Sequence, residues 1–375
     1  MKIFQQLLLH TSGDVSEAIS WLTELDKIHN LTSDDYGIAD FVKDLIDKGL
    51  LSQGERNGQL GFVPTSKMEM SLRKSAWDLN LNSCPKLEEV EFVSLDSIFG
   101  DLRVSSNPKM TKINIPSLKY VESNLVFATL SQLESQSISI GSPQNIENIQ
   151  IQNNDLFSDL SFLNGIRKVD NLTVILNKNL NSLSGLDLLS KVSVSIGIVR
   201  NPEIVTLQGL ESLEEVGFNF TLAFNENLIS TIGLNRLKFI GTEILGAGLE
   251  IDNNTEMANF YGLESLTHVY GGIAVDGCWG LKDLEPLKNL ELVTGLIAIR
   301  ENPLLIDISG LDNIDPEEVD SFKLSKNFNL ATCDTDFVCN YLETGKPAYI
   351  FENSFDCRSV EVIQDACLTS TVNLD

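Results

Sequence analysis

The chain has 375 residues and a formal net charge of −26, with three histidines and six cysteines. This acidity argues against nucleic acid or an anionic membrane as a partner, because phosphate groups are bound by basic surfaces. No run of about 20 apolar residues occurs, so no transmembrane helix is expected. The first residues, MKIFQQLLLHTSGD, lack the small-residue cleavage site of a signal peptide.

Residues 1–76 are predicted to form a small α+β module. Apolar residues recur at helical spacing over 16–29 and 34–49, and a further helix is expected over 66–77. Two short apolar runs around Gly54 and Gly58 predict a β-hairpin between these helices. The order of elements resembles a winged helix. It also resembles a helical segment that precedes von Willebrand factor A domains in some bacterial proteins.

A winged helix suggests DNA binding, but the candidate recognition helix over 34–49 is acidic. Its carboxylates outnumber its two lysines, and the residues concerned are Asp34, Asp35, Asp40, Asp44 and Asp47 against Lys43 and Lys48. A phosphate backbone would be repelled, so a structural cap or a protein-docking module is the preferred interpretation. The Asp-x-Ser-x-Ser metal motif of a von Willebrand factor A domain is absent, so that resemblance implies no metal site.

Residues 77–332 repeat the pattern apolar-x-apolar-x-x-Asn-x-x-apolar, for which Ile297, Ile299, Asn302 and Leu305 are one copy. The Asn, or a Cys in its place, returns every 22 to 27 residues, which predicts a solenoid of ten to eleven coils. We expect these side chains to form a buried ladder that bonds backbone groups at the bend after each strand. The ladder residues are Cys84, Asn107, Asn154, Asn179, Asn201, Asn227, Asn254, Cys278, Asn302 and Asn327, with Leu130 in a degenerate copy.

Each copy predicts a short strand whose alternate apolar side chains point inward. One coil cannot bury its own apolar face, so stability comes from stacking on its neighbours. The second apolar anchor falls three residues after the Asn. In this the chain resembles leucine-rich repeats of the receptor L-domain type, which are known from growth-factor receptor ectodomains and bacterial surface proteins. The resemblance implies a mainly β, right-handed stack, a fold that hosts many ligands.

Residues 333–375 are predicted to be a C-terminal cap with four cysteines. The run Cys-Asn-Tyr-Leu, a short strand, a Cys and a helix that ends in Cys resemble the cap that follows such repeats in secreted bacterial proteins. Four cysteines in about 35 residues favour two disulfides. Zinc is an alternative, although no His lies near and no Cys-x-x-Cys occurs. Reduced thiols in the core are a third possibility.

Three pairings of the cap cysteines are possible. We favour Cys333 with Cys357 and Cys339 with Cys367, because these bonds would tie the two cap helices to each other and to the last coil. Cys84 and Cys278 belong to the ladder and lie many coils apart, beyond the roughly 7 Å between Cα atoms that a disulfide allows. They are expected to stay reduced and buried.

No constellation typical of an enzyme is found. The sequence has no Gly-x-Ser-x-Gly, no P-loop, no Gly-x-Gly-x-x-Gly and no His-Glu-x-x-His. The histidines are His10, His29 and His268, and His268 is interpreted as a partly exposed structural residue on the return side of a coil. We therefore predict no catalytic residue, no cofactor and no metal site.

The outward strand positions predict two columns, with Ile175, Ala223, Glu250, Ala274 and Ala298 in the first and Val199, Asp252, Asp276 and Arg300 in the second. They predict a contact surface, because a flat apolar strip with a polar rim is typical of such sites. Trp279 is added as an exposed residue of a type favoured at binding hot spots. The predicted binding residues are Ile175, Val199, Ala223, Glu250, Asp252, Ala274, Asp276, Trp279, Ala298 and Arg300. In the alternative interpretation, the small residues merely suit a flat sheet and Trp279 packs on a neighbouring loop.

These features predict a monomeric, non-enzymatic recognition or adhesion module that binds a protein or a glycan through the sheet face, without membrane insertion. The cap cysteines favour an extracellular or cell-surface location, since cystines persist in oxidising compartments. The alternative is an intracellular scaffold that docks partners through the N-terminal module and the solenoid.

Overall fold

The structure is a computed structural model of the chain. It describes residues 75–372 except Leu245, three strands at 51–56, 59–64 and 67–69, and the single helical residues Thr23, Asp40 and Lys43. The rest of the helices expected over 16–29 and 34–49 lies outside the described residues. Contacts divide the chain into two compact units, one made of 1–146 with 153–156 and the other of 147–152 with 157–375.

The expected hairpin is present near the start of the described chain, but the helix expected after it is not. β1 (Leu51–Arg56) pairs antiparallel with β2 (Gln59–Pro64). The prediction of a helix over 66–77 is wrong, because β3 (Lys67–Glu69) and β4 (Ser75–Ala76) lie within it. Both strands pair in parallel with strands of the next coil, so long-range backbone pairing overrides the local helical spacing.

The first unit is a three-sided stack in which successive strands enter three parallel sheets in turn. One sheet contains β3, β6 (Glu89–Glu91), β9 (Lys112–Ile115) and β12 (Ile138–Ile140). The second contains β4, β7 (Ser97–Ile98) and β10 (Tyr120–Val121), and the third β5 (Leu79–Asn82), β8 (Leu102–Ser105) and β11 (Asn124–Ala128). A short 3-10 helix, η1 (Ser135–Ser137), precedes β12. Buried apolar columns such as Leu79, Leu102 and Leu125 form the core.

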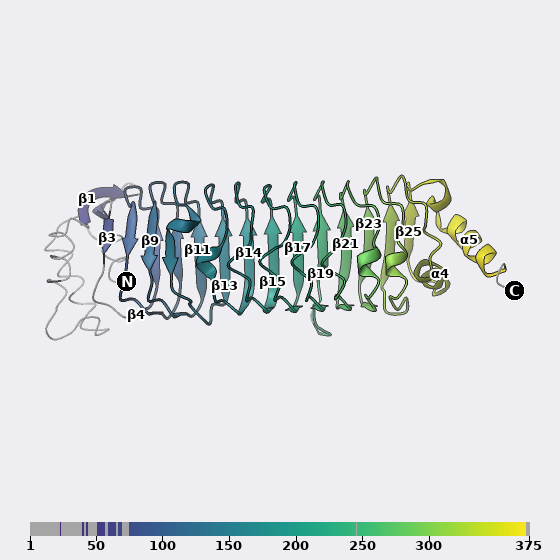
Figure 1. Cartoon of the computed structure of the whole chain (residues 1–375), viewed down its shortest axis with the longest axis horizontal. Helices are drawn as coiled ribbons and strands as arrows, with labels where there is room; N and C mark the ends of the chain where they lie inside the picture. The colour runs from purple at the N-terminus through teal and green to yellow at the C-terminus, as the bar shows by residue number, and fades with distance from the viewer. Residues whose placement is uncertain are drawn as a thin grey trace. The chain divides into compact units, whose positions relative to one another are not determined.

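The second unit stacks its main strands side by side in one parallel sheet (Figure 1). The strands are β13 (Asn148–Gln152), β14 (Lys168–Ile175), β15 (Lys191–Val199), β17 (Asn219–Ala223), β19 (Gly248–Asp252), β21 (Gly272–Asp276), β23 (Leu296–Arg300), β24 (Ser321–Ser325) and β25 (Ala348–Phe351). With the first unit, the described chain has about 12 turns of a parallel β-solenoid, slightly more than the ten to eleven expected.

The return side of the second unit is built from shorter elements. A small parallel row contains β16 (Glu215–Val216), β18 (Phe239–Ile240), β20 (His268–Val269) and β22 (Leu292–Val293), and 3-10 helices η2 (Ser161–Leu163), η3 (Glu285–Leu287) and η4 (Ser309–Leu311) complete other coils. His268 is half-buried between Phe239 and Tyr270, with ring centroids 5.5 and 5.8 Å away. It lies on the return side and has the structural surroundings expected for it.

Every coil bends sharply at the residue before its ladder position. This residue has a positive φ between 51° and 63° in all the coils, and the set is Ser83, Ser106, Thr129, Asn153, Leu176, Arg200, Phe224, Asn253, Gly277, Glu301, Lys326 and Glu352. The left-handed conformation costs about 1–2 kcal/mol for a residue other than glycine. The hydrogen bonds of the bend must therefore offset this cost.

The ladder residues supply those hydrogen bonds. The backbone N–H of one ladder residue donates to the side-chain oxygen of the Asn in the next coil, as from Asn201 to Asn225 at 3.0 Å and from Asn302 to Asn327 at 3.1 Å. The amide nitrogen of the same Asn donates back to a strand carbonyl, as from Asn225 to Ile198 at 2.9 Å. Buried amides at these positions are Asn107, Asn154, Asn177, Asn201, Asn225, Asn254, Asn302 and Asn327.

Two predicted ladder residues are wrong. Asn179 and Asn227 are exposed, and Asn177 and Asn225 take the ladder positions. The prediction treated Leu176 and Phe224 as inward anchors, whereas both occupy the left-handed bend and are 39% exposed. The structure also adds one more ladder residue in the cap, since the side-chain oxygen of Asn353 accepts the backbone N–H of Asn327 at 3.0 Å.

Cysteine takes the ladder position in two coils. The backbone N–H of Cys84 donates to Asn107 at 2.7 Å, and that of Cys278 donates to Asn302 at 2.9 Å. The Cys278 thiol donates to the carbonyl of Asp276 at 3.7 Å, which replaces one of the donor bonds of an amide. Both cysteines are free and buried.

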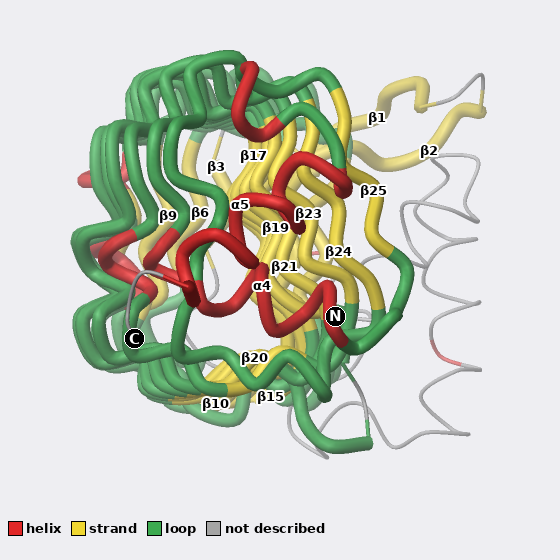
Figure 2. The backbone as a smooth tube through the Cα atoms, turned by 90° about the vertical axis from the view of Figure 1, so that its right-hand side faces the viewer, coloured by secondary structure: helices red, strands yellow, loops and turns green. Residues whose placement is uncertain are grey.

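Two helices close the C-terminal end of the second unit. α4 (Asp336–Glu343) and α5 (Val360–Val372) lie beyond the last strands and across the end of the stack (Figures 1 and 2). Phe337 and Tyr341 of α4 pack on Phe322, with ring centroids 5.7 and 5.8 Å away, so the helix covers the apolar end of β24. Disulfides join Cys333 to Cys357, in the 3-10 helix η5 (Phe355–Cys357), and Cys339 to Cys367, which is the favoured pairing.

Candidate functional site

The solvent side of the second unit's sheet presents two outward columns of side chains, which we call the recognition face. The first column runs Gln150, Thr173, Gly197, Thr221, Glu250, Ala274 and Ala298, and the second runs Gln152, Ile175, Val199, Ala223, Asp252, Asp276 and Arg300. Neighbours in each list pair directly across adjacent strands. The face thus has a fixed register, with one residue of each column per coil.

This register corrects the columns drawn from the sequence. Ile175 and Ala223 were assigned to the first column, but they pair with Val199 in the second. Thr173 and Thr221 take the vacated positions, and sequence reasoning missed them because the ladder register was shifted by two residues in those coils. The assigned columns of Val199, Glu250, Asp252, Ala274, Asp276, Ala298 and Arg300 agree with the pairing.

One half of the face, the apolar patch, consists of Ile175, Val199 and Ala223 with the edge residues Leu176 and Phe224. Leu176 and Phe224 are each 39% exposed. Arg200 occupies the same bend position in the coil between theirs, and its guanidinium lies 5.1 Å from the centre of the Phe224 ring. The strand position beside Val199 is Gly197, where an added Cβ would meet no atom within 4 Å. The patch is therefore flat, with Ile175 and Val199 half-buried and Leu176 and Phe224 exposed at its edge. Ala223 is buried, and so is Ala298 on β23, so the prediction of these two alanines as exposed contact residues is wrong.

The other half, the acidic patch, consists of Glu250, Asp252 and Asp276 on β19 and β21. Glu250 accepts a hydrogen bond from the Thr221 hydroxyl at 3.1 Å, and Asp252 accepts one from the Asn253 amide at 2.8 Å. Among the described residues, neither carboxylate has an ion-pair partner. Their charge is therefore directed to solvent.

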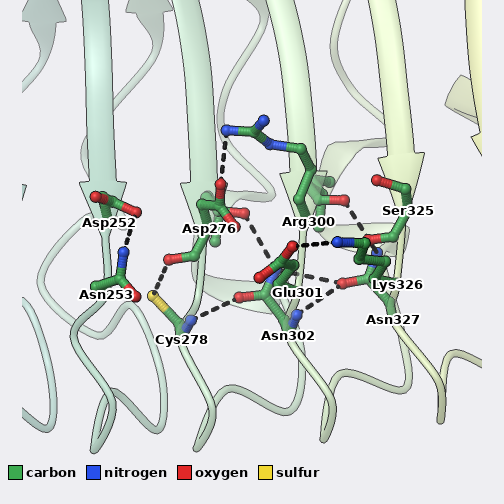
Figure 3. A network of polar contacts seen from close by, with 12 residues as sticks. Asp252, Asn253, Asp276, Cys278, Arg300, Glu301, Asn302, Ser325, Lys326 and Asn327 are labelled. Carbon is green, nitrogen blue, oxygen red and sulfur yellow. Dashed lines mark hydrogen bonds and ion pairs between the residues drawn. The ribbon is translucent and has the colours of Figure 1, made fainter.

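Asp276 is the one member of the acidic patch with a counter-ion. Its carboxylate lies 2.6 Å from the Arg300 guanidinium, which reaches across from β23 (Figure 3). Burial raises the pKa of Asp276, Arg300 lowers it, and the charge of Asp252 on the adjacent strand raises it again. The Nε of Arg300 is buried without a hydrogen-bond partner, so this guanidinium is held by the one carboxylate.

The edge beside this pair carries a second ion pair. Lys326 lies 2.6 Å from Glu301, and the lysine lowers the pKa of Glu301 while the carboxylate raises the pKa of Lys326 (Figure 3). Both groups lie at the left-handed bend, outside the two strand columns. Net negative charge is thus concentrated on Glu250 and Asp252.

Trp279 does not lie on the strand columns. It occupies the turn after β21, directly after the ladder residue Cys278, and is 57% exposed. The next two coils also expose apolar side chains in the turn after the ladder residue, namely Leu304 at 46%, two residues after Asn302, and Phe328 at 61%, directly after Asn327. Sequence reasoning found Trp279 but missed the other two, which the repeat register would have shown.

Within the described part of the chain, no group of three His, Cys, Asp or Glu side chains is arranged to hold a metal ion. The only described histidine, His268, stacks between aromatic rings on the return side. No helix among the residues described is long and apolar enough to cross a membrane.

The fold defines a leucine-rich-repeat-like β-solenoid, a class that is usually non-catalytic and typical of binding modules. No protein-family model matches the chain, and no curated protein matches it. Among solved structures, a leucine-rich repeat protein from Bacteroides ovatus ATCC 8483 is similar at 14% sequence identity and a TM-score of 0.24. The match covers 75% of this chain and 90% of that chain. The repeat geometry described above, rather than this likeness, defines the class of fold.

Proposed function

We propose that the protein is a non-enzymatic recognition module that binds a protein or a glycan through the recognition face. The observation that supports the proposal is the partly exposed apolar patch, which lies beside the carboxylates of Glu250 and Asp252 on one flat sheet surface. Neither carboxylate forms an ion pair with a described residue. Flat apolar areas bordered by polar groups are typical of contact sites. A solenoid presents such an area as an extended surface along its stacked coils.

The two cap disulfides support an extracellular or cell-surface location in the same proposal. Disulfides persist in oxidising compartments and are rare in the cytosol. The alternative, an intracellular scaffold, depends on the N-terminal module, most of which lies outside the described residues. The redox state of Cys333 and Cys339 in the native source separates these two candidates.

Gly197→Arg tests the proposed face. The position has open space above it, so the arginine should fit without disturbing the fold while placing bulk and charge in the centre of the face. The control is Asn227→Arg, which adds the same charge at an exposed turn of a neighbouring coil. Immobilised full-length chain is used to capture ligands from a protein mixture and from a glycan mixture.

The proposal expects that the chain and the Asn227→Arg variant capture the same ligand and that Gly197→Arg loses it, with equal thermal midpoints for all three. Capture that survives Gly197→Arg would place the binding site elsewhere.

A further inference from the structure

The recognition face is divided sharply into an apolar and an anionic part. Thr221 pairs with Glu250 and Ala223 pairs with Asp252, so the change of character falls between β17 and β19. The positions of the two columns on β14, β15 and β17 carry no charge, although Lys168, Asp170 and Lys191 lie nearer the start of β14 and β15. The column positions on β19 and β21 carry three carboxylates. A ligand that covers both parts must itself be divided in the same way.

The acidic part lacks sufficient positive charge of its own. Arg300 neutralises Asp276, but among the described residues no cationic side chain forms an ion pair with Glu250 or Asp252, and Asp252 and Asp276 are direct neighbours across the strands. Like charges at neighbouring strand positions are destabilising. A cation placed between them would relieve this repulsion.

Other charged groups border the face without changing this balance. Arg200 is at the edge of the apolar patch and stacks on Phe224. Glu301 and Lys326 pair with each other, and Lys323 lies 5.9 Å from the ring of Phe351, one coil beyond Arg300. The unpaired carboxylates therefore define the charge that a ligand would meet.

The carboxylates of the face favour a basic ligand. Aromatic side chains, on which glycans stack, lie at the margins of the face, at Phe224 in the apolar patch and at Tyr349 and Phe351 on β25, whereas no outward position of the two columns from β13 to β23 carries one. Aliphatic side chains and carboxylates instead suit an aliphatic segment followed by lysine or arginine. Nucleic acid and anionic lipid would be repelled by the same carboxylates.

We propose that the ligand of the recognition face is a basic protein segment in which aliphatic residues precede lysine or arginine. The inference rests on the proposed function and specifies its partner. Val199 and Asp252 are two strands apart, which is about 10 Å at about 4.8 Å per strand. An extended chain spans that distance with about three residues at about 3.3 Å each. The segment therefore has its cations about three residues beyond its aliphatic part.

The test uses the full chain and the fluorescein-labelled peptide Ile-Thr-Val-Gly-Lys-Gly-Lys, with Ile-Thr-Val-Gly-Glu-Gly-Glu as its partner probe. Fluorescence anisotropy measures both affinities for the chain, for the double variant Glu250→Gln with Asp252→Asn, and for Val199→Asn. The control double variant, Glu203→Gln with Glu256→Gln, also removes two negative charges, but at exposed turns outside the two columns. Thermal melts show that each variant is folded.

The lysine peptide should bind at least about tenfold more tightly than the glutamate peptide, and added salt should reduce the difference. The Glu250→Gln, Asp252→Asn variant should lose the preference, Val199→Asn should weaken both peptides, and the control should match the parent chain. The proposal of a basic ligand would be overturned by equal binding of the two peptides or by no binding of either. It would also be overturned if the Glu250→Gln, Asp252→Asn variant kept the preference for the lysine peptide.

The two proposals can fail separately. If Gly197→Arg abolishes capture of a glycan or of a protein while the peptides do not discriminate, the recognition function stands and the basic ligand is wrong. If the peptides discriminate but Gly197→Arg leaves them bound as before, the charge preference arises off this face and both proposals fall.

Discussion

The side-chain oxygen of Asn225 accepts the backbone N–H of Asn201 from the preceding coil at 3.0 Å, and both residues are fully buried. The amide of Asn225 also donates to the carbonyl of Ile198. One side chain therefore serves two backbone groups that the bend in the chain would otherwise leave without partners.

Asn225→Ala should lower the free energy of unfolding by about 1–3 kcal/mol for each buried group that loses its partner. Asn227→Ala is the matched control, two residues away and exposed, and should change stability by less than about 0.5 kcal/mol. Urea unfolding of the two variants decides between the register in the structure and the one drawn from the sequence. A larger loss for Asn227→Ala would reverse the assignment.

Alkaline pH should destabilise the protein through Cys278. Burial raises the pKa of its thiol from 9.0 to about 12, with a smaller opposite effect from the backbone N–H of Asn254. Between these values the unfolded chain releases a proton that the folded chain keeps. The stabilisation is therefore fully present below about pH 9 and falls as the pH rises toward about 12, by up to about 1.4 kcal/mol per pH unit.

Comparison with Cys278→Ala isolates this effect, because all other titrating groups are shared. Chemical unfolding at about pH 8.5 and about pH 10.5 should show an additional loss of about 1–2 kcal/mol in the parent chain relative to the variant. If the free energy of unfolding of the two proteins changed equally with pH, the raised pKa of the Cys278 thiol would be contradicted.

The cap disulfide between Cys339 and Cys367 should stabilise the C-terminal end. It joins α4 to α5 across a sequence separation of 28 residues, and replacing both cysteines with serine should lower the free energy of unfolding by about 2–4 kcal/mol. Mass mapping of the non-reduced protein should recover Cys339 linked to Cys367. A peptide that links Cys339 to Cys357 would exclude this arrangement.

Arg300→Gln should raise the pKa of Asp276 further above its ordinary value. Burial and the neighbouring Asp252 already raise it, and Arg300 is the main opposing group. Lys326→Gln removes a weaker opposing charge and should produce a smaller rise in the same direction. Carboxyl NMR titration measures both. Because the Arg300–Asp276 pair is partly exposed, its loss should cost less than about 1 kcal/mol of stability.

The repeat could be predicted from the sequence because its signal is redundant. Strand alternation, the amide and the following anchor agree in most coils. The cysteine pairing was chosen among three possibilities because it ties the cap helices to each other and to the last coil, and the structure has this pairing. The register failed where an apolar residue occupied the bend. Val174 with Leu176 mimics the pair Leu172 with Val174, but only the second choice places Leu180 three residues after the amide.

Other features had no local signal. The segment 66–77 has helical spacing, yet β3 and β4 form because strands of the next coil offer backbone partners. Asn353 escaped notice since Asp356, rather than an apolar residue, follows three positions later. The ion pair between Arg300 and Asp276 depends on strand register across coils, which spacing along the chain shows only once the ladder is placed correctly.

The ladder amides all face the same way along the chain, and this gives the protein a direction of assembly. Each arriving coil carries the acceptor for the N–H of the coil before it, as Asn254 does for Asn225 at 3.0 Å. A chain that emerges from the ribosome N-terminus first can therefore complete each coil as soon as the next one is made, without waiting for distant segments. Growth ends at Asn353, whose amide also turns forward to the carbonyl of Cys357 and so seals the last coil to its cap.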